Sequence, residues 1–338
     1  MAAAMSRRLL PTLVALLTLV PTGAAQAASL GGWNLPEQHA VREAGVMHDL
    51  GDAAFHGERP ITGAQLREAL GALALHQGTA PVTTFAERVS VVGFDRLLVG
   101  QLGAADVAAA AQHEAWRAGL RPPPAFGTEV VARFLGLRTN HPFPHEELEL
   151  YPTDAITRAE AAHSFAVALQ WGAGAADWAR QTFARFALPT YSAAQLRVLR
   201  PAVSKIGMPY IWGGETDGAG AWFGGQEHGG YDCSGFVWRV FKLSGLPWGR
   251  AIRGRTAAAQ SAEIARTARI RLADVQPGDL LFFGPGRFWQ KATERRITHE
   301  GIALSKDFMI HSSAQGVYVS PLFDPWRAAR FSWARRVL

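Results

Sequence analysis

Residues 231–237 read Tyr231-Asp232-Cys233-Ser234-Gly235-Phe236-Val237 and contain the only cysteine of a 338-residue chain. They lead into residues 234–243, whose apolar spacing predicts a helix. Cys233 would then stand at a helix start, where unpaired backbone amides favour an anion. Asp232 or Ser234 is expected to cap this helix. Because the thiolate is the reactive form of cysteine, this setting makes Cys233 a candidate nucleophile rather than a buried core cysteine.

Two downstream histidines stand beside predicted strands. His299 precedes the apolar run 301–304, and His311 follows the apolar run 308–310. Adjacent antiparallel strands can bring two imidazoles within hydrogen-bonding distance, so that the second fixes the tautomer of the first. Cys233, His299 and His311 therefore form a candidate nucleophile, base and orienting group. The helix-start amides, including that of Cys233, are candidates for holding an oxyanion.

Length and composition favour a globular protein of about two domains. The formal net charge is +6, and 48% of the residues are apolar. A basic protein is attracted to polyanions. No concentrated Lys/Arg cluster with interleaved aromatics is present, which argues against nucleic acid as a partner.

The N-terminus is typical of a signal peptide, predicted over residues 1–28. Arg7 and Arg8 precede the apolar run 9–20, and Ala25-Gln26-Ala27 supplies small residues for cleavage. We expect a protein secreted to the cell envelope, with a retained anchor as the alternative. No later run is long enough for a transmembrane segment in the mature chain. A lone thiol in an exported protein has no internal disulfide partner, which strengthens its candidacy for chemistry.

Residues 30–192 are predicted to be helical and contain internal repeats. The segments 60–66 and 155–161 match each other, and Thr62 and Thr157 each stand where a capping box would begin. A weaker copy occupies residues 89–94. The pattern around Ile156-Thr157-Arg158-Ala159-Glu160 resembles the S-layer homology (SLH) repeat. That resemblance implies an all-α module that binds anionic secondary cell-wall polymer, although only Arg158 keeps the motif's arginine. A helical spacer without polymer binding is the alternative.

Residues 193–338 have a different pattern, with helices first and short strands afterwards. Residues 193–206 predict a helix, and the runs 280–283, 301–304, 308–310 and 317–319 predict strands. This order favours an α+β fold.

Six motifs in this region resemble, in order, those of the NlpC/P60 family of cell-wall cysteine peptidases. They lie at residues 207–214, 231–236, 255–260, 277–283, 299–302 and 310–317. The resemblance implies a papain-like domain in which helices pack on a small antiparallel sheet. It also implies an exported hydrolase of peptidoglycan stem peptides that uses neither metal nor cofactor, with D-γ-glutamyl–diamino acid bonds as the expected target.

The resemblance also assigns site residues. Cys233 matches the nucleophile, His299 the base and His311 the third polar residue. Tyr210, Asp232 and Ser234 match positions that line the site or contact the amino end of the substrate, and helix capping is a compatible role for the last two. The open alternatives are an amidase or acyltransferase on the same scaffold, or an inactive wall-binding protein.

Four features near these motifs concern substrate preference. Glu300 replaces an apolar residue after the base, and is expected either to face solvent or to raise the pKa of His299. Trp212 is expected to pack rather than to contact substrate. The loop 215–230 is long enough to wall the groove, and the basic segment 287–296 is expected to attract peptide carboxylates.

Overall fold

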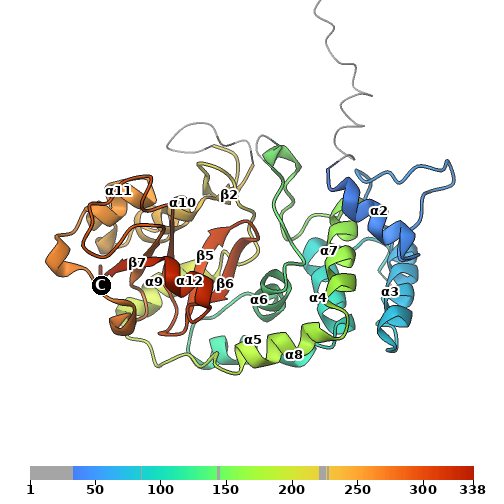
Figure 1. The fold of residues 1–338 in the computed structure, drawn as a ribbon, viewed down its shortest axis with the longest axis horizontal. Helices are drawn as coiled ribbons and strands as arrows, with labels where there is room; N and C mark the ends of the chain where they lie inside the picture. Colours follow the sequence, from blue (N-terminus) through green and yellow to red (C-terminus); the bar gives the residue numbers. More distant parts are fainter. Residues whose placement is uncertain (1–32, 85, 143–144, 221–225, 227) are drawn as a thin grey trace, which may run out of the picture.

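The computed structural model describes residues 33–84, 86–142, 145–220, 226 and 228–338. The predicted signal peptide lies outside these residues. Figure 1 shows an N-terminal helical region at one end of the molecule and a sheet with its own helices at the other. Within the described residues, no helix is long and apolar enough to cross a membrane.

The N-terminal region is helical, as the periodicity predicts. Its helices are α2 (Leu35–Glu43), α3 (Gly63–Gln77), α4 (Val91–Gln101), α5 (Ala105–Arg117), α6 (Phe126–Phe134), α7 (Arg158–Trp171) and α8 (Gly174–Phe183), with a short 3-10 turn at Glu146–Leu148. Thr62 forms the predicted capping box with Gln65. Thr157 caps α7, but the carboxylate of Glu160 instead binds Arg138 at 2.7 Å, so the second predicted box is only half formed.

The segments that open α3, α4 and α7 meet one another. Backbone bridges join Pro60 to Thr157, Thr62 to Arg88 and Ser90 to Ala155. Ser90 caps α4 as Thr62 and Thr157 cap their helices. The three similar sequence segments thus become three mutually paired helix starts.

The C-terminal region contains a five-stranded antiparallel sheet with the order β6-β5-β4-β3-β7. The strands are β3 (Leu280–Phe283), β4 (His299–Ala303), β5 (Phe308–Ser313), β6 (Gly316–Pro321) and β7 (Phe331–Arg335). All four predicted strands are confirmed, and β7 was not predicted. The central strands are buried on both faces, which explains their continuous apolar runs.

Helices of this region are α9 (Ala193–Val203), α10 (Cys233–Trp238), α11 (Ala257–Ala262) and α12 (Pro325–Arg330), with 3-10 turns at Pro247–Ala251, Arg266–Ala268 and Leu272–Asp274. Helix α10 continues as a π-helical segment over Arg239–Leu243 and packs against β4 and β5. Its buried Phe236 and Val240 join Phe282, Ile302 and Trp333 of the sheet in one core. Helices packed on a small antiparallel sheet confirm the predicted α+β class.

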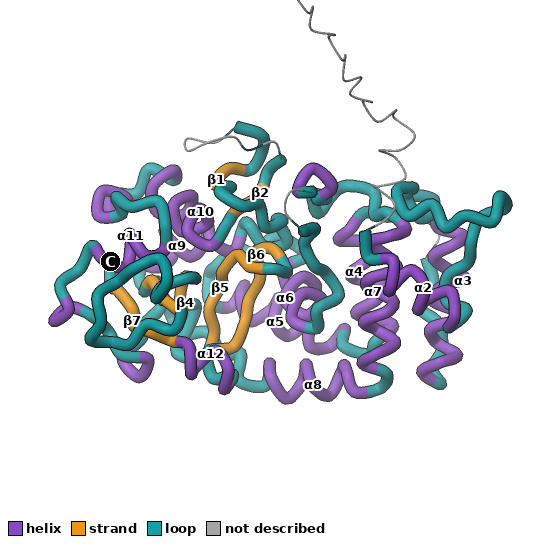
Figure 2. Tube along the Cα trace, turned by 45° about the horizontal axis from the view of Figure 1, so that its top comes forward, coloured by secondary structure: helices purple, strands orange, loops and turns teal. Residues whose placement is uncertain are grey.

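The two regions share an interface. Helix α6 packs against β6, and Figure 2 shows the two side by side. Buried Arg133 of α6 binds Glu129 through Nε at 2.7 Å and donates to the carbonyls of Gly207 and Gln315. The backbone N–H of Asn140 donates to the carbonyl of Ala314 at 2.8 Å. The N-terminal region is therefore packed against the elements that carry the candidate site.

Candidate active site

Cys233 is the first residue of α10, as predicted. Asp232 is the N-cap residue, and its Oδ1 accepts the backbone N–H of Gly235. The Asp232 backbone N–H donates to the carbonyl of Gly214 at 3.0 Å, which anchors the turn before the helix. Cys233 as a residue is partly exposed, and the backbone amides of Ser234 and Glu300 lie close enough to its thiol to lower the thiol pKa. Since Glu300 follows His299 directly, the thiol lies beside the first residues of β4.

His299, His311 and Ser320 form a row across three strands. His299 Nε2 lies 2.7 Å from His311 Nδ1, and His311 Nε2 lies 2.7 Å from the hydroxyl of Ser320. His299 is partly exposed, whereas His311 and Ser320 are buried. With Nε2 engaged, Nδ1 of His299 is the nitrogen left to act as a base. Sequence reasoning placed the two histidines correctly but missed Ser320.

Gly301 explains how the two imidazoles reach each other. It is the second residue after His299, and the antiparallel register of β4 and β5 carries it opposite His311. A Cβ at this position would lie 2.9 Å from His311 Cβ. Glycine therefore leaves room for His311 to turn toward its diagonal neighbour, which is the physical reason for the His-x-Gly pattern.

Burial shifts both Cys233 and His299 toward their neutral forms. It raises the pKa of the Cys233 thiol, with Asp232 and Glu300 adding to the effect. Burial, with a smaller contribution from Arg327, lowers the pKa of His299 to about 3. The pKa of His311 is lowered for the same reasons and by its neighbour His299. The helix-start amide of Ser234 lowers the pKa of the thiol, as expected, but desolvation has the larger effect and raises it.

A buried ionic network holds the N-cap in place. Arg255 binds Glu215 Oε2 and Asp232 Oδ1, each at 2.9 Å. The Ser234 hydroxyl donates to Asp232 and accepts from Arg255. Asp232 Oδ2 accepts the backbone N–H of Gly213 at 3.1 Å. Capping is thus confirmed for Asp232, and the hydroxyl of Ser234, 4% exposed, is directed into this network.

The N-terminal region supplies residues beside Tyr210. Cys233, Asp232 and Glu146 all lie close enough to Tyr210 to raise its pKa, after the larger effect of burial. Asn140 Nδ2 donates to the Tyr210 carbonyl at 2.9 Å, and Glu146 Oε1 accepts the backbone N–H of Trp212. Sequence reasoning missed Asn140 and Glu146, because no local pattern indicates a contact across such a sequence separation.

Two expectations about neighbouring residues are wrong. Trp212 is 69% exposed, so it does not pack into the core. Glu300 is fully buried on the face of β4 that packs on α10, so it does not face solvent. The pKa of His299 is lowered rather than raised, and Glu300 is not among the causes. Burial instead raises the pKa of Glu300 itself well above its usual range.

The base of the loop 215–230 is ordered by β1 (Glu215–Thr216) and β2 (Gly230–Tyr231), which pair antiparallel. Its predicted role as a wall of the groove depends in part on residues outside the described ones.

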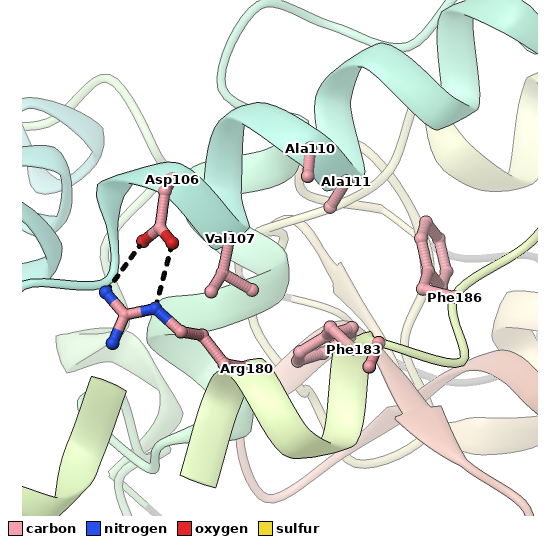
Figure 3. Close-up of a pocket in the computed structure, with 8 residues that line it drawn as sticks. Asp106, Val107, Ala110, Ala111, Arg180, Phe183 and Phe186 are labelled. Atoms are coloured by element: carbon pink, nitrogen blue, oxygen red, sulfur yellow. Dashed lines mark hydrogen bonds and ion pairs between the residues drawn. The ribbon is translucent and has the colours of Figure 1, made fainter. Parts of the chain in front are cut away.

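A cavity of about 410 Å³ opens beside His299. Another, of about 210 Å³, lies between α5 and α8 in the N-terminal region. Arg180 of this second cavity forms an ion pair with Asp106 at 2.9 Å. Figure 3 shows the two side chains directed toward each other, so the charged groups of this cavity neutralise each other. Within the described ranges, no cluster of three or more His, Cys, Asp or Glu residues could hold a metal ion. Of these two cavities, the one of about 410 Å³ is lined by a candidate catalytic residue, His299.

Comparison with known proteins gives a family for this region. Residues 207–336 match the NlpC/P60 family. A probable endopeptidase of Mycobacterium tuberculosis (strain H37Rv) is 30% identical over 138 residues, covering 38% of this chain and 28% of the relative. The bifunctional muramidase/DL-endopeptidase CwlT of Bacillus subtilis is 31% identical over 139 residues, covering 41% of this chain and 35% of the relative.

Two further similarities lie in the same region. The gamma-D-glutamyl-L-lysine dipeptidyl-peptidase of Bacillus subtilis is 29% identical, covering 33% of this chain and 29% of the relative. The crystal structure of an NlpC/P60 family protein from Bacillus cereus ATCC 10987 is 26% identical, covering 45% of this chain and 42% of that one, with a TM-score of 0.32. The chain spans about a third or less of the length of these curated relatives. It carries an NlpC/P60 family domain at residues 207–336, and a probable peptidoglycan endopeptidase of Bacillus subtilis is among the proteins similar to it.

Proposed function

We propose that this chain is an exported cysteine peptidase that hydrolyses peptidoglycan stem peptides at the D-γ-glutamyl–diamino acid bond. The observation that carries the proposal is the placement of Cys233 at a helix start beside β4, whose first residue is a base oriented by His311 and Ser320. The NlpC/P60 relatives support the substrate class. The signal-peptide pattern supports export to the cell envelope.

The mechanism follows from the neutral resting pair. His299 Nδ1 takes the thiol proton as the sulfur attacks the amide carbon, so charge develops only during the reaction. Backbone amides at the start of α10 stabilise the developing oxyanion. His299 then gives the proton to the leaving amine, and a thioester remains on Cys233. Water, deprotonated by the same imidazole, attacks the thioester, and the thiol is restored when the acid product leaves.

The amino end of the peptide would lie on the acidic side of the site. Asp232 and Glu146 both lie close enough to Tyr210 to raise the pKa of its phenol. Carboxylates bind a free ammonium group through charge-assisted hydrogen bonds. We assign Tyr210, Asp232 and Glu146 to this subsite, with Ser234 holding the Asp232 carboxylate through its hydroxyl.

The structure favours the spacer alternative for the N-terminal region. Arg158, the one arginine kept from the repeat motif, is 2% exposed and donates to the carbonyls of Phe55 and His48. Its guanidinium also lies over the Phe55 ring at 4.6 Å. An arginine satisfied in this way is a structural residue, so we propose that this helical region mainly supports and completes the peptidase site.

Mass spectrometry of products from a defined stem tripeptide, L-Ala-γ-D-Glu-diamino acid, tests the proposal. We expect the dipeptide L-Ala-γ-D-Glu and the free diamino acid. Cys233→Ala is expected to lower the rate by at least about a thousandfold, because no other thiol can replace the nucleophile. An unchanged melting temperature would show that the variant is folded. Full activity of Cys233→Ala would refute the mechanism, and cleavage before L-alanine in an intact muropeptide would favour the amidase alternative.

A further inference from the structure

The cavity of about 410 Å³ next to His299 has a composition distinct from the rest of the site. Its walls include His299 and Phe283 from the sheet, the turn at Ser313–Gln315, and Arg327 and Arg330 from α12. Among the described residues that line it, none is Cys233, Tyr210 or Asp232. The cavity therefore lies on the base's side of the site, away from the acidic subsite.

The charge of this cavity is positive. Two arginines line it, and no carboxylate is found among its described lining residues. The nearest acid in sequence, Asp324, is occupied as the cap of α12, accepting the backbone N–H of Arg327 at 3.0 Å. Arg330 lies over the ring of exposed Trp326 at 4.5 Å. Arg327 Nε is buried without a hydrogen-bond partner in the structure as described.

The reaction chemistry says which part of a peptide reaches this cavity. A general acid must lie beside the amine that leaves, so the leaving half of the substrate occupies the side of the imidazole. In a stem peptide this half begins with the diamino acid. Its carboxylates are the anionic groups that a pair of arginines would recognise.

We propose that Arg327 and Arg330 form a subsite that binds a carboxylate of the leaving half of the peptide. This assignment rests on the proposed function, and it adds a specificity-determining pair to it. The carboxylate has two possible sources, the side chain of a diaminopimelate residue and the terminal carboxylate of the tripeptide. The basic segment 287–296, which the sequence suggested would attract peptide carboxylates, contributes no lining residue to this cavity.

Four matched tripeptides separate these sources. One is L-Ala-γ-D-Glu-diaminopimelate with both carboxylates free; the second and third carry a single amide, on the side-chain or the terminal carboxyl. The fourth has lysine as the diamino acid. We expect kcat/KM to fall about tenfold or more on amidation of the recognised carboxylate, since that loses a charge-assisted contact. If kcat/KM is lower for the side-chain amide and for the lysine peptide than for the free acid, the recognised group is the side-chain carboxylate of diaminopimelate. If it is lower for the terminal amide, the recognised group is the terminal carboxylate of the tripeptide.

Arg327→Gln and Arg330→Gln test the residues through the ratio of kcat/KM for the acid to that for the amide. This ratio cancels any general effect of Arg327 on His299. We expect the ratio to approach one in the double variant and to fall in each single variant. Arg266→Gln, which removes an exposed arginine outside the cavity, should keep the wild-type ratio. Equal rates of wild type on all four peptides, or an unchanged ratio in the double variant, would overturn the subsite. Absence of cleavage of every peptide would instead count against the proposed function.

Discussion

Desolvation is the largest influence on the pKa values of the individual titratable side chains at this site. Burial shifts both Cys233 and His299 toward their neutral forms. In the proposed mechanism, the proton therefore moves from sulfur to nitrogen only when a substrate carbonyl is attacked. Glu300 shows the same effect without an evident catalytic role. Its two carboxylate oxygens are buried and have no hydrogen-bond partner among the residues the structure describes.

Glu300→Gln is expected to stabilise the protein at neutral pH. The folded-state pKa of Glu300 is raised above its unfolded value near 4.5, so the folded state keeps a proton that the unfolded state releases. Below pH 4.5 both states are protonated and the substitution should change little. Above it, wild-type stability falls relative to the variant by about 1.4 kcal/mol per pH unit until the folded pKa is reached.

Melting temperatures between pH 4 and pH 8 measure this effect. The advantage of Glu300→Gln should grow with pH. Glu87→Gln, which changes an exposed carboxylate, provides the control. An advantage that is independent of pH, or a loss of stability at pH 8, would contradict the assignment of a buried neutral acid.

At the scale of elements, the strands β4, β5 and β6 align three side chains that the sequence separates. His311 pairs with Tyr318 across β5 and β6, which makes Ser320 its diagonal neighbour. If the Ser320 hydroxyl accepts from His311 Nε2–H, then His311 Nδ1 accepts from His299 Nε2–H, and His299 Nδ1 is free to accept the thiol proton. With the hydrogen bonds in this direction, the row leaves His299 in the tautomer whose Nδ1 is the base.

Ser320→Ala is expected to lower kcat about tenfold with little change in KM, because buried His311 Nε2 loses its partner and the tautomer is no longer fixed. Ser320→Thr, which restores a hydroxyl, should recover much of the rate. Ser332→Ala removes another buried hydroxyl, one that donates to the Gly286 carbonyl at 2.9 Å outside the row. It should lower stability to a similar degree while leaving kcat unchanged. Equal kinetic losses in Ser320→Ala and Ser332→Ala would show that Ser320 is merely structural.

At the scale of the whole molecule, the N-terminal region is joined to the peptidase region by a buried charged interface. Arg133 is 5% exposed and Glu129 is 1% exposed, and the pair lies where α6 meets β6. Arg133 also holds the carbonyl of Gly207, the residue at which the family match begins. Stability of the site therefore depends on a residue from outside the NlpC/P60 domain.

Arg133→Met is expected to destabilise the protein by about 3 to 5 kcal/mol, since it leaves Glu129 buried without its counter-charge. Chemical denaturation followed by tryptophan fluorescence measures the loss. The double variant Glu129→Gln/Arg133→Met should recover part of it. Arg180→Met breaks an ion pair on the exposed surface and should have a far smaller effect. Similar losses in Arg133→Met and Arg180→Met would refute the importance of the interface.

Local sequence was sufficient to predict the helices, four of the strands, and the candidate site residues Cys233, His299 and His311. Periodicity, capping residues and short motifs are properties of neighbours along the chain, and the corresponding structure forms within a few residues of them. The position of Cys233 at a helix start could therefore be predicted from residues 231–237 alone.

Contacts between distant segments could not be predicted in this way. Ser320, Asn140, Glu146 and Arg327 reach the site only because strand pairing and the α6–β6 interface bring their elements together. Burial, too, is a property of the packed molecule, and it made Glu300 a buried acid and Trp212 an exposed ring. The sequence by itself determined the candidate nucleophile, Cys233, and the helix start that carries it. Only the tertiary structure decided the protonation states of Cys233 and His299, because these depend on which distant groups exclude water. It also decided the charge on each side of this pair, because that depends on which charged residues the packing brings there.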